Sequence, residues 1–218
     1  YSTTLRVLGG ESSIEAAVAP LLEAENPTAA IYCKTGECEI RITARAATAA
    51  EGEKMCRASA QKFYEILGDA VYDENVPGLA DTLVRTLREK GLTAAAAESC
   101  TGGQVAQRLT ALPGASQVYR GGAVSYWTQV KADVLGVPQA LLEEYGAVSA
   151  EAARAMAAGA PRITGADIAV SVTGAAGPDP DERGVEAVLF SPLPLPPTRQ
   201  VAVLAGRPPL TKPHTRRQ

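Results

Sequence analysis

Residues 93–103 read Thr-Ala-Ala-Ala-Ala-Glu-Ser-Cys-Thr-Gly-Gly, and this stretch decides the fold class. A short apolar run that ends in a glycine-rich turn is typical of a buried strand that enters a helix. Residues 167–173 (Asp-Ile-Ala-Val-Ser-Val-Thr) read as a second such strand, followed at once by Gly174-Ala-Ala-Gly-Pro178. Strands that alternate with helices and end in such turns predict a layered α/β/α domain, which we place at residues 77–183.

Apolar periodicity and the positions of glycine and proline predict the other elements of this domain. A strand is expected over residues 117–126. Helices are expected over residues 79–91, from Gly103 to about Leu109, and over 128–134, 138–145 and 149–160.

Residues 1–72 predict a small, open-faced α+β domain. Strands are expected over residues 3–8, 29–34 and 37–45, and helices over 14–22 and 49–67. Ser12 and Ser13 are the expected caps of the first helix, because a serine hydroxyl accepts a hydrogen bond from a free helix amide. Residues 72–77 (Tyr-Asp-Glu-Asn-Val-Pro) are the expected linker to the second domain.

The last stretch, residues 184–218, holds seven of the fifteen prolines. Proline-rich chain favours extended, solvated backbone over helix or central strand. We therefore expect an irregular C-terminal tail with one candidate strand at residues 200–205.

Composition is that of a soluble folded protein and argues against two classes of partner. Of 218 residues, 46% are apolar and 21% are charged, and no apolar run approaches the roughly eighteen residues of a membrane span. Residues 1–76 carry 7 basic and 12 acidic side chains, a net charge of −5. Nucleic-acid affinity rests on Lys and Arg, so we expect no nucleic-acid partner. The chain opens at Tyr1 without a basic-then-apolar leader, which predicts a segment of a longer, cytoplasmic polypeptide.

Cysteine and histidine usage argues against a structural zinc site. The four cysteines contain no CxxC pair, and the one histidine is His214 in the tail. Cys33 and Cys38 oppose each other across the strands if Thr35-Gly36 is a two-residue turn. A disulfide is within reach at that spacing, but the lack of an export signal favours a reduced, small apolar pair.

Two constellations are candidates for chemistry at a nucleophile and a base. In the first, residues 98–103 leave a strand and enter a helix, so Ser99 lies beside amides that favour an anion or an oxyanion. The alternative is a plain helix start capped by Ser99 or Thr101. The second is Gly121-Gly122-Ala-Val-Ser125-Tyr126, with Lys131 five residues on.

A lysine one turn beyond a strand end can reach back to the strand's tip. Burial lowers the pKa of a lysine, so the neutral amine becomes a possible general base. The alternative is an ordinary surface lysine at residue 131 and a packed tyrosine at residue 126. A third candidate is the turn Thr173–Pro178, whose amides either line a pocket or simply form a tight turn.

The position of the histidine limits the mechanism. With His214 in a proline-rich tail, a Ser-His-Asp triad or a Cys-His dyad has no base. If Ser99 is a nucleophile, its activator is a lysine, a tyrosine or a carboxylate. Cys100 is an alternative nucleophile, although one cysteine beside a glycine-rich turn is more often buried packing.

The motifs of the second domain carry a family resemblance. They occur in family order as Ala97–Gly103, Leu112–Ser116, Gly121–Tyr126, Lys131, Leu135–Val137, Gly146–Ser149 and Val172–Pro178. Together they resemble the C-terminal domain of the CinA family, the nicotinamide mononucleotide deamidase. Residues 1–72, including 32–37 and 41–44, resemble the KH-type middle domain of longer CinA proteins.

The resemblance implies hydrolysis of the carboxamide of nicotinamide mononucleotide to nicotinic acid mononucleotide and ammonia, without a metal or cofactor. Ser99 would attack the amide carbon, and Tyr126 and Lys131 would take its proton and pass it to the leaving ammonia. Turns that would hold the substrate's phosphate or the oxyanion contain Thr101, Gly102, Gly103, Gly121, Gly122, Thr173, Gly174 and Gly177. Family members often self-associate, so a homo-oligomer is the expected assembly.

The chain departs from the family's pattern after Asp179. Residues 181–185 lead into the Pro-Leu-Pro segment, where the family has a glycine-rich loop, a strand and a closing basic helix. A catalytically inactive nucleotide-binding or assembly module is therefore the alternative function. A nucleic-acid-binding protein, suggested by the family's competence label, is disfavoured by the acidic charge of residues 1–76 and by the lack of a GxxG loop.

Overall fold

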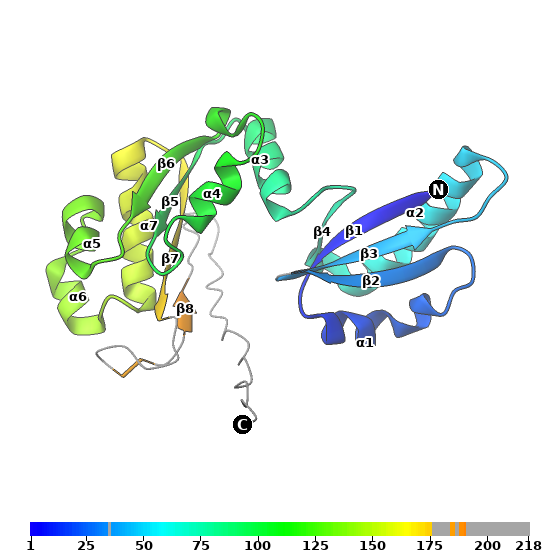
Figure 1. Ribbon diagram of the computed structural model, residues 1–218, viewed down its shortest axis with the longest axis horizontal. Coiled ribbons are helices and arrows are strands. Elements are labelled where there is room, and N and C mark those ends of the chain that lie inside the picture. The colour runs from blue at the N-terminus through cyan, green and yellow to red at the C-terminus, as the bar shows by residue number, and fades with distance from the viewer. Residues whose placement is uncertain (35, 176–183, 186–187, 191–218) are drawn as a thin grey trace, which may run out of the picture. The chain divides into compact units, whose positions relative to one another are not determined.

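The computed structural model describes residues 1–34, 36–175, 184–185 and 188–190. The chain forms two compact units, Tyr1–Leu83 and a second unit that begins at Val84 (Figure 1). In the part described, no helix is both long and apolar enough to cross a lipid bilayer.

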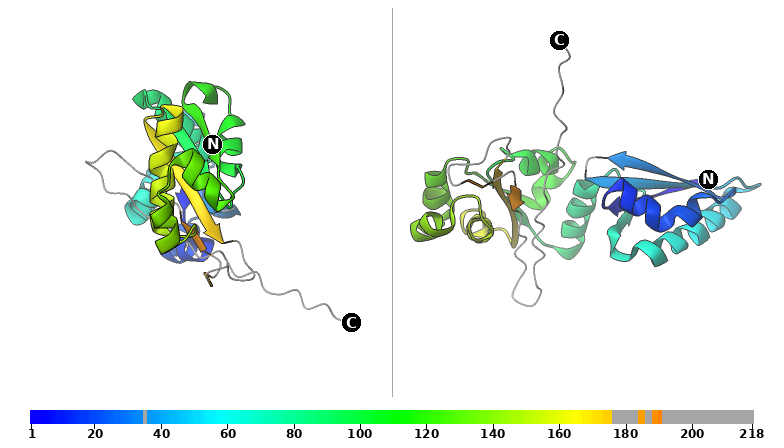
Figure 2. Two further views of the ribbon diagram at one scale, coloured as in Figure 1. Left: turned by 90° about the vertical axis from the view of Figure 1, so that its left-hand side faces the viewer. Right: turned by 90° about the horizontal axis from the view of Figure 1, so that it is seen from below.

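The N-terminal unit is a four-stranded antiparallel sheet with two helices on one face (Figures 1 and 2). Strands β1 (Ser2–Leu8), β2 (Thr28–Lys34), β3 (Glu37–Thr43) and β4 (Val71–Glu74) lie in the order β2-β3-β1-β4. Helices α1 (Glu11–Leu22) and α2 (Ala49–Leu67) pack on the face that presents Leu5, Val7, Ile40 and Ile42. This arrangement confirms the predicted open-faced α+β domain.

Two local predictions in this unit are wrong. Residues 71–74 include the start of the predicted linker, but they follow a 3-10 turn, η1 (Gly68–Ala70), and pair with β1 as the edge strand β4. A four-residue strand is too short to show a clear alternation in sequence. Gly10, rather than Ser12 or Ser13, is the N-cap of α1, and no side chain caps it. The helix begins at Glu11, so both serines lie inside its first turn.

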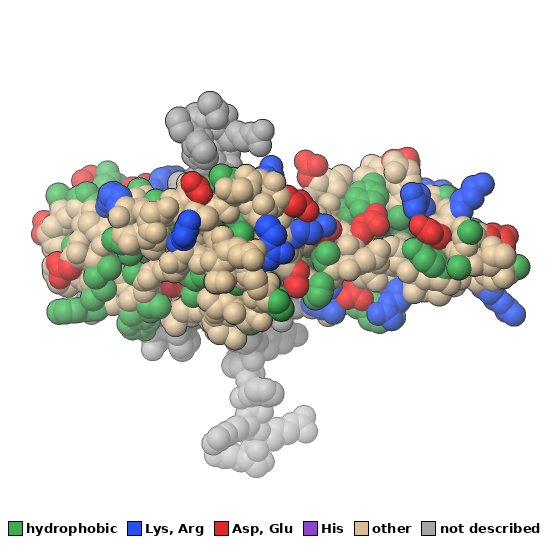
Figure 3. Space-filling view, turned by 90° about the horizontal axis from the view of Figure 1, so that it is seen from above, with side chains coloured by type: hydrophobic (Ala, Val, Ile, Leu, Met, Phe, Trp, Pro, Cys, Tyr) green, Lys and Arg blue, Asp and Glu red, His purple; other side chains and the backbone are tan. Residues whose placement is uncertain are grey.

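The opposite face of this sheet carries a network of paired charges. Arg6 is 1% exposed and pairs with Glu37 and, at 2.8 Å, with Glu39. Lys34 and Arg41 also pair with Glu39, and the hydrogen bond from Lys34 is the largest cause that holds the pKa of Glu39 below its usual range. Partners on neighbouring strands offset the cost of burying these charges. On the molecular face in Figure 3, Lys and Arg side chains are likewise interspersed with Asp and Glu.

The C-terminal unit is a layered α/β/α domain, which confirms the predicted fold class. Strands β5 (Ala94–Glu98), β6 (Tyr119–Val124), β7 (Ile168–Ala175) and β8 (Val188–Phe190) lie in the order β6-β5-β7-β8. Strand β5 is parallel to both β6 and β7. Helices α5 (Thr128–Leu135), α6 (Gln139–Tyr145) and α7 (Ala150–Thr164) lie on one side of the sheet, and α4 (Gln104–Thr110) lies on the other (Figure 2). Helix α3 (Leu79–Lys90) precedes β5, and the turn η2 (Ala115–Gln117) precedes β6.

Strand β8 corrects the expectation of an irregular tail from residue 184 onward. Its residues 188–190 pair antiparallel with residues 173–175 of β7. This apolar Val-Leu-Phe run comes before the first proline of the Pro-Leu-Pro segment, so each of its residues keeps the backbone N–H group that a sheet requires. The candidate strand at residues 200–205 lies outside the described residues.

Small residues let the layers of this unit approach closely. Residues 94–97 of β5 are alanines, each at most 6% exposed. A Cβ atom on Gly122 of β6 would lie 1.8 Å from the carbonyl oxygen of Ala96. A Cβ atom on Gly159 of α7 would lie 2.1 Å from the carbonyl oxygen of Leu135, at the end of α5. Glycine at these two positions is therefore a requirement of packing.

Gly159→Ala is expected to destabilise the protein, although alanine is intrinsically better than glycine in a helix by about 1 kcal/mol. The added methyl group overlaps the backbone of Leu135, and overpacking of this kind typically costs about 1–3 kcal/mol. Thermal unfolding followed by circular dichroism measures the change. Ala158→Gly, at an exposed position of the same helix, is the control for helix propensity. A Gly159→Ala protein as stable as the unchanged chain would contradict the close approach of α7 to α5.

Candidate active site

Ser99 lies directly after β5, at the carboxyl edge of the parallel strands. Its amide donates to the carbonyl oxygen of Val172 on β7 at 2.9 Å, which extends the strand pairing one residue beyond β5. The chain then turns through Gly102 and Gly103, whose φ angles of +58° and +102° favour glycine. Ser99 is 6% exposed, so the sheet holds the nucleophile candidate in place.

Lys131 reaches Ser99 from the first turn of α5. Its Nζ atom lies 2.9 Å from Ser99 Oγ, 2.6 Å from the carbonyl oxygen of Ser125 and 3.4 Å from that of Tyr126. The lysine is 1% exposed. The structure therefore brings together Ser99 and Lys131, two residues that the sequence singles out as nucleophile and base.

The surroundings of Lys131 favour the neutral amine. Burial lowers its pKa below the ordinary value of 10.5, because the interior disfavours an ammonium ion, and the nearby Cys100 acts in the opposite direction. Within the described part of the chain, the hydrogen-bond partners of Nζ are one hydroxyl and two carbonyls, and none is a carboxylate. In the neutral form, two N–H bonds serve the carbonyls and the lone pair faces the Ser99 hydroxyl. Such an amine can accept the serine proton.

Hydrogen bonds through Ser125 link Lys131 to the strand end that carries Ser99. Ser125 is 0% exposed, and its amide and hydroxyl donate to the carbonyl oxygen of Glu98 at 2.7 and 3.3 Å. The carbonyl of Ser125 in turn accepts from Lys131, which contacts Ser99, the residue next to Glu98. Ser125 belongs to the motif of residues 121–126, but the sequence did not indicate that it binds Lys131. The reason is that its main-chain carbonyl, not its side chain, accepts from the lysine.

The carboxylate of Glu98 satisfies the start of α4. Glu98 is 1% exposed, and its two oxygens accept from the amides of Val105 at 2.9 Å and Ala106 at 2.8 Å. These amides are among the four at a helix start that lack partners within the helix. Sequence reasoning missed this role, because Glu98 lies seven and eight positions before the amides that it binds, outside the local signals of a helix start.

Within α4 itself, which begins at Gln104, the first amides are therefore not free for an anion. Besides the two amides held by Glu98, those of Gln104 and Gln107 bond to the carbonyls of Thr101 and Gly103. The alternative of a cap by Ser99 or Thr101 is wrong, because the N-cap is Gly103 and makes no side-chain bond.

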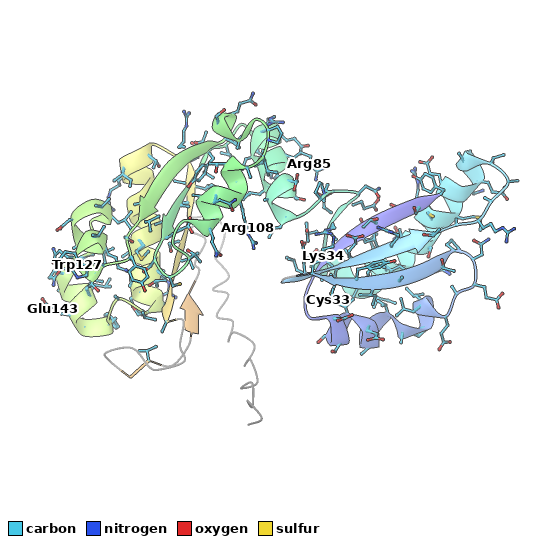
Figure 4. All side chains as sticks on the ribbon, viewed as in Figure 1. Cys33, Lys34, Arg85, Arg108, Trp127 and Glu143 are labelled. Carbon is cyan, nitrogen blue, oxygen red and sulfur yellow. The ribbon has the colours of Figure 1, made fainter. Side chains whose placement is uncertain are left out.

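Tyr126 contributes to the site through its main chain. Its carbonyl accepts from Lys131, but its side chain is 77% exposed, as is 71% of the neighbouring Trp127 at the start of α5 (Figure 4). Within the described residues, the phenol is not a hydrogen-bond partner of either Lys131 or Ser99. The structure therefore does not bring the expected phenol to the serine.

Four of the predicted binding residues are integrated into the sheet. Thr173 is 0% exposed, and its hydroxyl donates to the carbonyl of Ala147 at 2.8 Å. Gly174 pairs with β8, and Gly121 and Gly122 pair with β5. These contacts give each residue a part in packing or strand pairing.

Thr101 has an unpaired polar atom in the turn after Ser99. Its Oγ1 atom is buried and has no hydrogen-bond partner among the described residues. A buried hydroxyl without a partner costs free energy until another group pairs with it. Among the predicted binding residues, Thr101 therefore has a side-chain hydroxyl that can still form a hydrogen bond. Gly177, another predicted binding residue, lies outside the described residues.

Cys100 is a weaker nucleophile candidate than Ser99. Burial is the largest cause that raises the pKa of its thiol above the ordinary 9.0, and it outweighs the lowering by two backbone amides and by the charge of Lys131. A thiol with a raised pKa is mostly protonated near neutral pH and reacts slowly. Ser99 has the direct hydrogen bond to the base.

Comparison with known proteins places both units in one family. Residues 77–190 match the family model of the CinA C-terminal domain, and residues 2–72 match that of the damage-inducible protein CinA KH domain. A CinA-like protein of Dictyoglomus turgidum is 45% identical over 82% of this chain and 44% of its own length. A putative competence-damage inducible protein of Clostridium novyi is 42% identical over the same shares. The chain thus spans less than half the length of these relatives.

Solved structures agree with this assignment. A competence-damaged protein (CinA) superfamily protein of Escherichia coli is 32% identical, with a TM-score of 0.55 over 59% of this chain and 74% of its own. A competence/damage inducible protein of Agrobacterium tumefaciens is 35% identical, with a TM-score of 0.54 over 59% of this chain and 78% of its own. The chain belongs to the CinA family, and it contains that family's KH domain and C-terminal domain.

Proposed function

We propose that the C-terminal unit hydrolyses the carboxamide of nicotinamide mononucleotide, giving nicotinic acid mononucleotide and ammonia. The observation that carries the proposal is the 2.9 Å contact between Lys131 Nζ and Ser99 Oγ. A buried amine beside a serine hydroxyl can activate the serine where no imidazole is near. The choice of substrate is supported by the resemblance of the surrounding motifs to the nicotinamide mononucleotide deamidase domain of the CinA family.

The reaction begins with proton transfer from Ser99 to neutral Lys131. As the proton crosses to Nζ, Oγ forms a bond to the carboxamide carbon, and the carbonyl oxygen of the substrate becomes an oxyanion. The carbonyls of Ser125 and Tyr126 lie against the new ammonium ion and stabilise its charge. We assign the donation of a hydrogen bond to the substrate to Thr101 Oγ1, which is buried and has no partner among the described residues.

Collapse of the tetrahedral intermediate breaks the C–N bond. The Lys131 ammonium gives its proton to the leaving nitrogen, which departs as ammonia and leaves an ester on Ser99. The neutral amine then takes a proton from water, and the hydroxide attacks the ester carbon. The proton returns to Ser99 Oγ as nicotinic acid mononucleotide leaves, so the enzyme is regenerated.

The first test measures ammonia release from nicotinamide mononucleotide. Ser99→Ala removes the attacking oxygen and is expected to lower kcat by at least about 10³-fold. Ser116→Ala, at an exposed position of η2, is the matched control and is expected to keep full activity. Calorimetric binding of the nucleotide without ammonia release by the unchanged chain would contradict the proposal and select the inactive binding module.

The second test asks whether Lys131 acts as a proton acceptor or only through its positive charge. Lys131→Met removes the amine and Lys131→Arg keeps a permanent positive charge, and both are expected to lower kcat by about 10²–10⁴-fold because neither can take a proton. Lys62→Met, at an exposed position of α2, controls for the loss of a lysine. An active Lys131→Arg protein would show that residue 131 acts by charge alone.

The third test uses the pH dependence of kcat/KM. Only the neutral amine is a base, so activity is expected to rise with pH along the acid limb as Lys131 loses its proton. Burial lowers the pKa of Lys131, so the midpoint of this limb is expected below 10.5, the ordinary value for lysine. Tyr126→Phe is expected to leave the midpoint unchanged, since the phenol lies outside the hydrogen bonds of the lysine. A midpoint that moves with this substitution would make Tyr126 the base.

A further inference from the structure

We propose that Cys33 and Cys38 in the N-terminal unit are a redox-active dithiol, which a peroxide oxidises to a reversible disulfide. Cys33 lies on the edge strand β2 and Cys38 on its neighbour β3, and both are free thiols in this structure. This inference concerns a different unit from the proposed amidase site and does not depend on it.

The register places the two cysteines directly opposite each other. Cys33 pairs with Cys38, and the next pair toward the loop is Lys34 with Glu37. Two residues join this pair, so it is the hydrogen-bonded pair that closes the hairpin. The cysteines one step further out then form a non-hydrogen-bonded pair, whose Cα atoms lie about 4.5 Å apart. That separation falls within the range of disulfides, about 4.4–6.8 Å.

The side chains of these residues meet on one face of the sheet. Residues directly opposite in an antiparallel pair point to the same side. A sulfur–sulfur bond can therefore form while the strands keep their register.

The two thiols have unequal access to solvent. Cys33 is exposed near the end of β2, beside Lys34 (Figure 4), whereas Cys38 is 0% exposed beneath it. Burial is the largest cause that raises the pKa of the Cys38 thiol. Cys33 is thus the thiol that meets a dissolved oxidant first, and Cys38 is positioned to react with the product.

The proposed oxidation has two balanced steps. The Cys33 thiolate attacks hydrogen peroxide, the O–O bond breaks, and the products are a sulfenic acid on Cys33 and one water molecule after protonation. The sulfur of Cys38 then attacks the sulfenic sulfur, the S–OH bond breaks, and a second water molecule leaves. Two thiols lose two electrons to one peroxide, and a dithiol reductant reverses the change by exchange.

The other two cysteines lie in different surroundings. Cys56 is 0% exposed, and its Sγ contacts the carbonyl oxygens of Tyr1 and Ile42 at 3.7 and 3.6 Å. Cys100 lies in the turn after Ser99, where burial raises the pKa of its thiol. Neither is paired in register with another cysteine in the described sheets.

The test treats the reduced full chain with a small excess of hydrogen peroxide, removes the peroxide, and alkylates the remaining thiols after denaturation. Two of the four cysteines are expected to escape alkylation. Trypsin cuts after Lys34, so the cysteines fall in separate peptides, residues 7–34 and 35–41. These peptides are expected to be joined, and a dithiol reductant is expected to separate them. In the reduced folded protein, alkylation of Cys33 is expected to be at least about tenfold faster than that of Cys38.

Variants complete the test. Cys38→Ala is expected to stop the reaction at a sulfenic acid on Cys33, which a dimedone probe labels, while Cys56→Ala is expected to form the same linked peptides as the unchanged chain. Cys33→Ser, at an exposed position, is expected to leave Cys38 alkylated after peroxide, and it provides the test if Cys38→Ala does not fold. Alkylation of all four cysteines after peroxide, or loss of a Cys100 thiol alone, would overturn the proposal.

Discussion

The C-terminal unit depends on one costly placement, the burial of the Lys131 amine beside Ser99. An ammonium ion in a protein interior loses several kcal/mol of hydration unless a counter-charge replaces it, and within the described residues the partners of Nζ are neutral oxygens. The neutral amine avoids this cost. Two carbonyl oxygens then accept hydrogen bonds from its N–H groups, and the nitrogen lone pair faces the serine hydroxyl. Burial, which would make a structural lysine unfavourable, in this way favours the neutral form of the amine that can accept a proton.

Main-chain atoms supply most of the geometry around this pair. The amide of Ser99 bonds to β7, and the amide of Ser125 bonds to the carbonyl of Glu98, so the ends of three parallel strands are held together. The carboxylate of Glu98 attaches α4 to the same point. Rigid strands and a helix therefore position the reacting groups, which is the condition for a short approach to the substrate carbon. Alanines in β5 and Gly159 in α7 contribute by allowing the layers to lie close enough.

Much of the fold and of the candidate site could be predicted, because the sequence signals for strands and turns are local. Apolar runs of the correct length indicated the strands, and glycine-rich exits marked residues 98–103 and 121–126 as the ends of two of them. Local signals also had limits. The edge strand β4 is too short for a pattern, and the cap of α4 comes from Glu98, a residue seven and eight positions before the amides it binds. The Tyr126 side chain is 77% exposed, and this exposure depends on which segments pack around the end of β6, which apolar spacing does not record.

The sequence by itself determined the two mixed α/β units, the family and the candidate serine and lysine, because residue types and strand periodicity are written in neighbouring positions. Only the tertiary structure decided that Lys131 reaches Ser99, that the Tyr126 phenol does not, and that the amides at the start of α4 are occupied. It also decided that Cys33 and Cys38 differ in exposure. Each of these outcomes depends on burial and on contacts between segments distant in the chain. Those are fixed by how the layers pack, which no single stretch of sequence records.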